Sequence, residues 1–395
     1  MDEKQKGEYQ TVVLAALLHD VGKFLHRGNG VYKGSHEEAS SKFIEKFCDN
    51  FKNDALYNIH LVSLIVQHHH STKIETLKNA YFIGKSEKEK NRIWKLITIV
   101  KRADTYSCAE RDIEQQRRRD IDKKRAPLDS IFSKINLDIK SLQEENNYRY
   151  HLKPLDPFTT FPDTINALSE DEIKELIKQF EENIPDFSRF KSFDDVLNKW
   201  LNIIEKYMWA VPSDTRYETS DVSLYDHLRS SAAIAACLYK RHIIAIEEGK
   251  KLDRVNEFIF IGGDFSGIQN YIFDITNRGS GGASKRLRAR SFFIFLFSEV
   301  TIHKILHALD LPIVCNLFSS AGKFLLLAPN IEGVDNILQR IKAEIEQEIH
   351  DTYFSQFSFL MSYKAVKGFK EIFKVYNFFE TADEMFHRLE SGKIK

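Results

Sequence analysis

Apolar residues recur at helical spacing through the first 110 positions of the chain. Three such stripes are formed by Val13, Ala16 and Leu17, by Leu61, Leu64 and Ile65, and by Ile93, Leu96, Ile97 and Val100. Residues three or four apart share one face of a helix, so each stripe predicts a helix with a buried face. We therefore expect residues 1–110 to be all-helical.

The pattern changes from residue 256 onwards, where strand and helix patterns alternate. Strands are predicted over 258–261, 313–318, 324–328 and 357–363, and helices over 268–275, 291–309 and 333–350. Gly262 and Gly263 are expected to end the first strand. The order βαββαβ is that of a ferredoxin-like domain, the palm of many polymerases and cyclases.

The region between these two parts has a mixed pattern. Proline clusters such as LKPLDPFTTFPD lie beside two amphipathic stretches, 169–183 and 193–209. The charged stretch 111–125 predicts an exposed helix end that runs into a linker. We predict an α+β protein, with an all-α domain over 1–118, a helical and extended connector over 119–255, and a ferredoxin-like palm domain over 256–395.

Charge and cysteine content narrow the class of protein. The 395 residues include 57 Lys and Arg and 57 Asp and Glu, which excludes a strongly basic nucleic-acid coat but not a local basic groove. The four cysteines form no CxxC pair, which argues against a zinc ribbon or a disulfide scaffold and fits a reducing cytoplasm. The polar N-terminus is unlike a signal peptide, and the apolar run 291–300 is too short to span a bilayer. We expect a cytoplasmic protein with no membrane partner.

Each of the three N-terminal stripes ends in potential metal ligands. His19 and Asp20 end the first stripe, His68 and His69 the second, and Asp104 the third. A carboxylate or imidazole that points into a core is costly unless it is paired or binds a metal, so these ends predict a pocket of nitrogen and oxygen donors. Such donors suit Mn, Fe, Ni, Co or Zn.

Two further residues extend this predicted site. His36, after a glycine-rich loop, is a further candidate ligand, and Lys23, one turn beyond the HD pair, would place its ammonium near a phosphate oxygen. A lone histidine is more often a hydrogen-bonded core residue than a ligand, and we assign His26, His60 and His70 to that class. An HD dipeptide alone carries little weight. The combination of HD-x-G-K, a downstream His, a His-His pair and a later Asp is much more specific.

The order HD…H…HH…D resembles the nuclease branch of the HD phosphohydrolase superfamily, including the dinuclear nucleases of CRISPR interference. The chain departs from that pattern at its start. Many HD proteins have a histidine one helix before the HD pair, whereas the eighteen residues before it here contain none. Either the missing ligand comes from elsewhere in the chain, as in a permuted HD domain, or one metal ion is bound more weakly.

A second set of candidates lies around the turn that follows the first palm strand. Its members are Asp264, Ser266, Gly267 and Gln269. Exposed N–H groups and a helix dipole predict an anion site at this turn, and a serine there can cap the helix. Four cations ahead of the next helix, Lys285, Arg286, Arg288 and Arg290, would neutralise phosphates of a nucleic acid. On physical grounds alone, a capped turn beside a solvated basic face explains these residues equally well.

The palm motifs GGDFSGIQNYIF, SKRLRARSFF and SSAGKFLLLAP are similar to the first palm of the large subunit of type III CRISPR–Cas effector complexes. LLHDVGKFLHR, HHH and KRADTYSCAERD resemble its HD domain, and APLDSIFSKI and YRYHLKPLDPF resemble its connector in the III-A (Csm) subtype. Members of that family continue into a cysteine-rich zinc segment and a second palm with a Gly-Gly-Asp-Asp motif. Phe265 replaces the second Asp here and the chain stops at Lys395, so we expect the N-terminal part of such a subunit, either a split gene product or a shortened form.

The resemblance implies metal-dependent cleavage of single-stranded DNA by the HD domain. The implied metal ligands are His19, Asp20, His36, His68, His69 and Asp104, and His19, Asp20 and Lys23 would be catalytic. Mn²⁺ and Ni²⁺ are the expected ions, with Co²⁺ and Fe²⁺ as further candidates. ATP with Mg²⁺ would bind half of a composite palm site through Asp264, Ser266, Gly267 and Gln269, and cyclic oligoadenylate synthesis would need the second palm.

The resemblance also implies partners. These are the other Csm subunits, CRISPR RNA with its 5′ tag near this subunit, target RNA that activates both outputs, single-stranded DNA, and a second-palm polypeptide if the gene is split. Two alternatives stay open, a scaffold subunit with a silent HD site and a stand-alone HD phosphohydrolase that acts on nucleotides.

Overall fold

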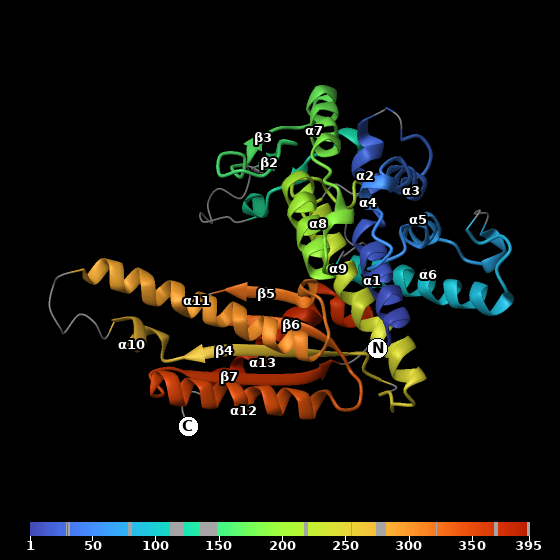
Figure 1. Cartoon of the computed structure of the whole chain (residues 1–395). Coiled ribbons are helices and arrows are strands. Elements are labelled where there is room, and N and C mark those ends of the chain that lie inside the picture. Colours follow the sequence, from blue (N-terminus) through green and yellow to red (C-terminus); the bar gives the residue numbers. More distant parts are fainter. Residues whose placement is uncertain are drawn as a thin grey trace. The chain divides into compact units, whose positions relative to one another are not determined.

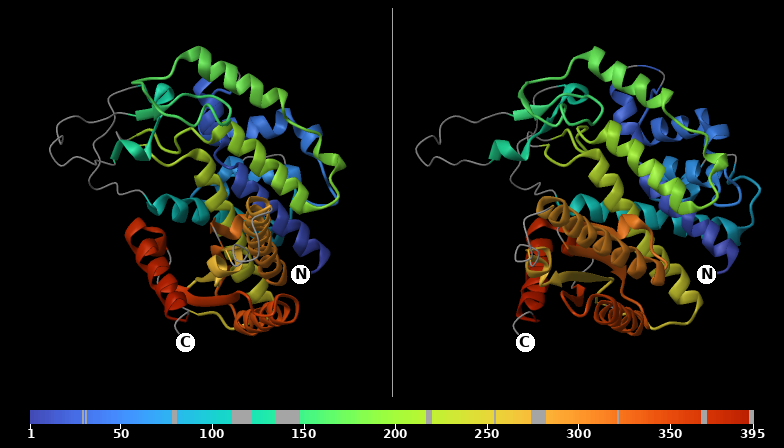
Figure 2. Two further views of the ribbon diagram at one scale, coloured as in Figure 1. Left: turned by 90° about the vertical axis from the view of Figure 1, so that its left-hand side faces the viewer. Right: turned by 60° about the vertical axis from the view of Figure 1, so that its left-hand side comes forward.

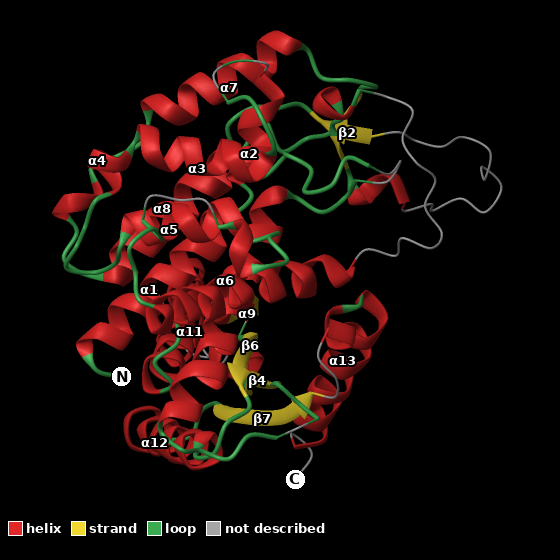
Figure 3. Cartoon of the chain, turned by 90° about the vertical axis from the view of Figure 1, so that its right-hand side faces the viewer, coloured by secondary structure: helices red, strands yellow, loops and turns green. Residues whose placement is uncertain are grey.

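The computed structural model describes residues 1–28, 30, 32–77, 81–110, 122–134, 148–216, 220–253, 255–273, 282–320, 322–366 and 370–392. The chain divides into two compact units, Met1–Ala235 and Ala236–Lys395. The first unit is mainly helical, whereas the second contains the larger sheet (Figure 1 and Figure 3). The predicted α+β class, helical at the start and ferredoxin-like at the end, is confirmed.

The helices of the first unit follow the predicted stripes. They are α1 (Glu3–Leu18), α2 (Val21–Leu25), α3 (His36–Lys46), α4 (Cys48–Phe51), α5 (Ile59–His68), α6 (Glu87–Ser107), α7 (Glu170–Glu182), α8 (Phe193–Met208) and most of α9 (Leu224–Tyr239). Capping boxes at Asp2, Ser35, Ser86 and Ser169 start α1, α3, α6 and α7, because each cap satisfies backbone N–H groups that have no partner within the helix. A small antiparallel sheet pairs β1 (Leu128–Asp129), β2 (Tyr148–Tyr150) and β3 (Asp163–Thr164) in that order.

The core of the first unit is built around α1, which is buried on all sides from Tyr9 to Leu18. Helices from the predicted connector share this body. Phe43 of α3 stacks on Phe180 of α7, with ring centroids 5.3 Å apart. Phe51 of α4 contacts the Trp200 ring of α8 at 5.0 Å. The first helices and the connector therefore pack as one compact body up to Ala235, and a boundary at residues 118 and 119 remains a prediction.

The second unit has the predicted βαββαβ order. Its elements are β4 (Phe258–Ser266), α10 (Ile268–Phe273), α11 (Ala283–Ala308), β5 (Asn316–Ser320), β6 (Lys323–Pro329), α12 (Val334–Tyr353), β7 (Ser358–Val366) and, in addition, α13 (Val375–Gly392). The strands form one antiparallel sheet in the order β5-β6-β4-β7, which is the ferredoxin-like arrangement.

Helices cover both faces of this sheet (Figure 1 and Figure 2). Side chains alternate along a strand, so neighbouring residues of β4 face opposite layers. Phe265 packs against Phe297 of α11, with ring centroids 5.5 Å apart. Phe260 packs instead against Phe378 of α13, at 5.3 Å. The helix α13 was not predicted. It covers the face of β4 on which Gly262 lies.

The first palm strand is longer than predicted. β4 does not end at the two glycines but continues to Ser266, because Gly262 and Gly263 pair with β6 on one side and β7 on the other. A Cβ at Gly263 would lie only 2.1 Å from the ring of the buried Phe324, so the aromatic side chain of β6 occupies the space that any larger residue would need. The turn falls at Gly267, whose φ of +84° favours glycine.

The next two elements also differ from the prediction. The basic residues do not precede the predicted helix but occupy the first two turns of α11, which begins at Ala283, since Ala, Lys, Arg and Leu are strong helix formers. α11 is also largely exposed rather than buried, as Phe292 (61% exposed) illustrates. The predicted strand 313–318 begins with a 3₁₀ turn at Ile313–Cys315 after Pro312, and β5 follows. Residues 111–121 of the predicted charged stretch, and residues 274–281, lie outside the described residues.

Among the residues that the structure describes, α11 alone is long and apolar enough to cross a membrane by those two measures. Core helices of folded domains pass the same test. Ile294 and Ile302 of α11 are buried within the second unit, as expected of a helix that packs on a sheet.

A glycine-to-alanine pair tests the packing of β4. Gly263→Ala should lower the free energy of unfolding by about 1–3 kcal/mol, since the new methyl group would overlap the Phe324 ring. Gly262→Ala is the matched control, because its methyl group would meet the flexible side-chain ends of Met385, at 3.1 Å, and Leu389, at 3.4 Å. Urea unfolding followed by circular dichroism measures both variants. Equal midpoints for the two would contradict this account of β4.

Candidate metal centre

Four separate elements of the first unit bring polar side chains to one place in its core. His19 follows the last residue of α1, and Asp20 precedes the first residue of α2. Asp104 lies in the last turn of α6, and His227 lies in the first turn of α9. These four residues could hold a metal ion together, and all four are buried.

The four donors of this first group alternate between imidazole and carboxylate. His19 Nε2 lies 3.4 Å from Asp20 Oδ2 and 3.6 Å from Asp104 Oδ1. His227 Nε2 lies 3.3 Å from each of the same two oxygens. Two ligands at about 2.0–2.2 Å from one ion are separated by roughly 3–3.5 Å, so these spacings fit a shared metal ion.

The imidazoles are held so that Nε2 points to the centre. His19 Nδ1 donates to the Ala16 carbonyl at 2.8 Å, and His69 Nδ1 donates to the Val66 carbonyl at 2.7 Å. His227 Nδ1 forms a 2.9 Å hydrogen bond with Ser107 Oγ. The Nε2 atoms of all three, and Oδ1 of Asp20, are buried with no hydrogen-bond partner among the described residues. Such atoms are costly to bury, and a metal ion would satisfy them.

A second donor group lies against the first. His36, His69 and His70 could hold an ion together, and His36 Nε2 lies 3.2 Å from His70 Nε2. Asp20 links the groups. Its Oδ1 lies 3.3 Å from His36 Nε2 and 3.7 Å from His69 Nε2, whereas its Oδ2 faces His19. One carboxylate therefore has an oxygen toward each group, as a ligand that bridges two ions would have.

The electrostatics of these side chains follow from burial and charge. Burial alone would lower the pKa of His19, but the carboxylates of Asp20 and Asp104 outweigh it and raise that pKa to about 10. Burial would raise the pKa of Asp20, yet Lys23 and His19 hold it well below its usual range. For His69, burial and the charge of His19 together lower the pKa well below its usual value. A metal ion that binds the first group would thus displace a proton from His19.

Lys23 occupies the edge of the site. Its Nζ lies 2.5 Å from Asp20 Oδ2, and its side chain is 26% exposed. The ammonium is therefore both paired with a buried carboxylate and accessible from solvent.

The predicted palm residues lie at the end of β4. Asp264 and Ser266 belong to the strand, and Asp264 is buried. Gly267 makes the turn, and Gln269 lies in the first turn of α10. Their role in nucleotide binding stays a prediction.

The predicted basic residues differ in their surroundings. Lys285, Arg286 and Arg288 are exposed on α11. Arg290 is half-buried, since its guanidinium lies over the Tyr271 ring, 4.9 Å from the centroid, and donates to the Tyr271 carbonyl. Arg290 thus ties α11 to α10, whereas the other three face solvent. Nucleic-acid binding by this set stays a prediction.

Comparison with known proteins places these observations in a family context. Residues 2–109 match the HD domain family, and residues 257–395 match the family of the Csm1 subunit domain B. The chain is related to Csm1, the large subunit of type III-A effector complexes. The predicted resemblance is therefore confirmed.

Relatives of known name support this relationship. The "CRISPR system single-strand-specific deoxyribonuclease Cas10/Csm1 (subtype III-A)" of Methanocaldococcus jannaschii is 29% identical over 392 residues, which cover 89% of this chain and 44% of that protein. The crystal structure of Csm1 from T. onnurineus has a TM-score of 0.76 and 26% identity, over 98% of this chain and 49% of that one. A Csm1–Csm4 cassette in complex with cA3 has a TM-score of 0.73 and 25% identity, over 98% and 49%. The chain spans about half the length of these relatives.

The structure brings together most of the predicted ligands and adds two. His19, Asp20, His36, His69 and Asp104 all lie in the two donor groups. His68 belongs to neither group, and its Nδ1 lies 3.2 Å from Ser71 Oγ. His70, which we assigned to the core, is 44% exposed at the side chain and joins the second group.

His227 was not predicted, because it lies more than 100 residues beyond Asp104. The sequence indicated a further ligand only indirectly. The chain has no histidine before the HD pair, and of the two explanations the geometry favours the first, a ligand supplied from elsewhere. His227 of α9 lies where such a ligand would be, 3.3 Å from Asp20 Oδ2 and from Asp104 Oδ1.

Proposed function

We propose that this chain is a metal-dependent nuclease that cuts single-stranded DNA, within a type III-A CRISPR effector complex. The observation that carries the proposal is the pair of donor groups joined by Asp20, whose two oxygens face different sets of imidazoles. Two ions held side by side suit displacement at a phosphate, because one can serve the attacking oxygen and the other the leaving oxygen. The printed name of the archaeal relative, a single-strand-specific deoxyribonuclease, supports the substrate.

The two donor groups and Lys23 would have different roles in cleavage. His19, Asp20, Asp104 and His227 would hold one divalent ion, and His36, His69 and His70 would hold another beside Asp20. When bound, these ions supply the Lewis acidity that activates water and neutralises charge on the phosphate. Lys23, at the exposed edge, is placed to leave Asp20 and pair with a phosphate oxygen of the substrate.

The nitrogen and oxygen donors narrow the choice of ion. Imidazole with carboxylate suits Mn²⁺, Ni²⁺, Co²⁺ or Fe²⁺, and we propose Mn²⁺ or Ni²⁺ as the working ion. The described donors of both groups include no thiolate.

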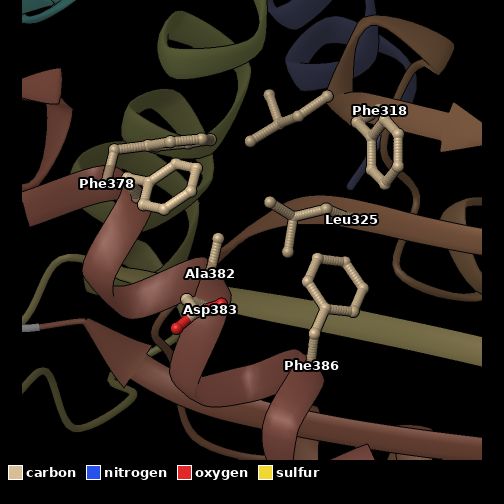
Figure 4. Close-up of a pocket in the computed structure, with 8 residues that line it drawn as sticks. Phe318, Leu325, Phe378, Ala382, Asp383 and Phe386 are labelled. Carbon is tan, nitrogen blue, oxygen red and sulfur yellow. The ribbon is translucent and has the colours of Figure 1, made fainter. Parts of the chain in front are cut away.

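For the palm unit we propose a share in a composite ATP site that needs a second palm. The cassette that holds cA3 supports this part of the proposal. A groove of about 380 Å³ on this unit is lined by Phe318 and Leu325 from the strands and by Phe378 and Phe386 from α13 (Figure 4). Phe379, at its rim, is 71% exposed. Exposed apolar surface of this kind marks interaction sites, so we propose this groove as part of the surface that a second-palm polypeptide covers.

The proposed partners are the Csm subunits, CRISPR RNA, target RNA and single-stranded DNA. The solved Csm1–Csm4 cassette supports a protein partner of the Csm4 type. The exposed Lys285, Arg286 and Arg288 of α11 are the residues we propose for contacts with nucleic-acid phosphates.

Substrate form provides the test of the nuclease function. A flexible strand can bring its phosphate onto the ions, whereas a duplex must first unpair at a cost of a few kcal/mol. With Mn²⁺, we expect labelled single-stranded DNA to be cut at least about tenfold faster than blunt duplex DNA. Equal rates on the two forms would count against the proposal.

The same assay separates the two alternatives. A scaffold with a silent site would cut neither DNA with any divalent ion. A stand-alone phosphohydrolase would release phosphate from nucleotides and leave DNA intact.

A further inference from the structure

Most imidazoles of the two donor groups form a hydrogen bond at Nδ1 with an uncharged group. His19 and His69 each donate from Nδ1 to a backbone carbonyl, and His227 is held by the Ser107 hydroxyl. His36 differs. Its Nδ1 faces a carboxylate, and Oε2 of Glu37 lies 3.5 Å away.

Glu37 is placed between two imidazoles of the second donor group. Its Oε1 lies 3.8 Å from His70 Nε2, while its Oε2 faces His36. The Glu37 side chain is only 16% exposed, and Oε2 is buried with no hydrogen-bond partner among the described residues.

Glu37 lies in the first turn of α3. The capping box there is made by its neighbour, Glu38. The Glu38 N–H donates to Ser35 Oγ, and the Ser35 N–H donates to Glu38 Oε2. Two adjacent acidic residues in one helical turn thus have different surroundings. Glu38 is exposed and caps the helix, whereas Glu37 faces the histidines.

We propose that Glu37 is a positioning residue, which holds His36 so that its Nε2 stays turned toward the second donor group and thereby strengthens metal binding there. A ligating histidine commonly donates its other ring N–H to a carboxylate, which fixes the ring and makes the ligand more basic. At 3.5 Å the pair is in ion-pair range, and a shift of a few tenths of an ångström would make it a hydrogen bond. The inference rests on the proposed function for the presence of the ions.

Titration of the full chain with Mn²⁺ alone tests this role. Calorimetry gives the number of ions and their affinities, and electron paramagnetic resonance reports whether two ions are coupled. We expect the wild type to bind two Mn²⁺ ions. Glu37→Ala should weaken the second ion by about 10–100-fold, the usual effect of losing an outer-shell partner, and leave the first unchanged. Glu37→Gln keeps an acceptor oxygen and should show a smaller loss.

Glu38→Gln is the matched control. It removes a charge at the adjacent position and disturbs the capping box, but it should bind both ions as the wild type does. Circular dichroism checks the helix content of each variant. Unchanged affinity of the second ion in both Glu37 variants would overturn the proposal. So would equal weakening of both ions, the same loss in Glu38→Gln, or a wild type that binds fewer than two ions.

The proposed function can fail separately. A wild type that binds two Mn²⁺ ions, with the second dependent on Glu37, supports the positioning role even if it cuts no DNA. That result would contradict the nuclease function alone.

Discussion

A chain that carries His19→Ala together with Asp20→Ala is expected to lose cleavage of single-stranded DNA. The change removes one imidazole of the first donor group and the carboxylate that faces both groups. Loss of an outer-shell partner alone typically costs 10–100-fold, so removal of two direct ligands should cost more than about 100-fold. The measurement is degradation of end-labelled single-stranded DNA with Mn²⁺ or Ni²⁺, and EDTA should stop the wild type to the same extent.

The double variant should keep its helices. His19 and Asp20 lie between α1 and α2, and neither side chain belongs to the apolar contacts that bury α1. Far-ultraviolet circular dichroism verifies this. His60→Ala is the control histidine, because His60 is exposed on α5 and belongs to neither donor group. Undiminished cleavage by the double variant, with folding verified, would remove the assignment of this site.

Synthesis of cyclic oligoadenylate from ATP is expected to need a second polypeptide. Joining two ATP molecules requires a 3′-hydroxyl and an α-phosphate held together by two ions, about 4 Å apart, on adjacent carboxylates. At the palm turn the chain has Asp264 followed by Phe265, so this position lacks a carboxylate pair. We expect the purified chain with ATP and Mg²⁺ to yield no cyclic oligoadenylate. A second-palm polypeptide added in trans should restore synthesis if it docks on the exposed groove around Phe318 and Phe379.

Mass spectrometry of the reaction mixture measures the product. A Phe379→Ser variant should weaken the rescue in trans, since it removes an exposed ring from the rim of the groove while the half-buried Phe378 remains in place. Oligoadenylate made by the chain alone, and lost in Asp264→Ala, would refute this argument and place a complete cyclase site in the palm unit.

Local patterns were sufficient for the elements and for much of the metal site. The helical stripes predicted α1, α5 and α6, because a helix with one buried face has apolar residues at every third or fourth position. The same stripes located the HD pair and Asp104 at helix ends that converge. The alternation from Phe357 to Tyr363 predicted β7, and the order of strands and helices predicted the ferredoxin-like unit.

Local patterns failed where a distant contact overrides them. Gly262 and Gly263 normally interrupt a strand, yet β4 runs through them because the Phe324 ring from β6 fills the space above Gly263. The three consecutive histidines share one stretch of sequence, and only the path of the chain after α5 places His70 rather than His68 beside His36.

By itself, then, the sequence determined which segments become helices or strands, which order they follow, and which residues could bind a metal ion. These properties depend on neighbours within one or two turns, so spacing along the chain reports them. The tertiary structure alone decided that α9 brings His227 to face Asp20 and Asp104, and that Asp20 turns one oxygen to each donor group. The contact between Asp20 and His227 joins residues 207 positions apart (227 − 20). Such contacts depend on how the helices pack, which no periodicity along the chain encodes.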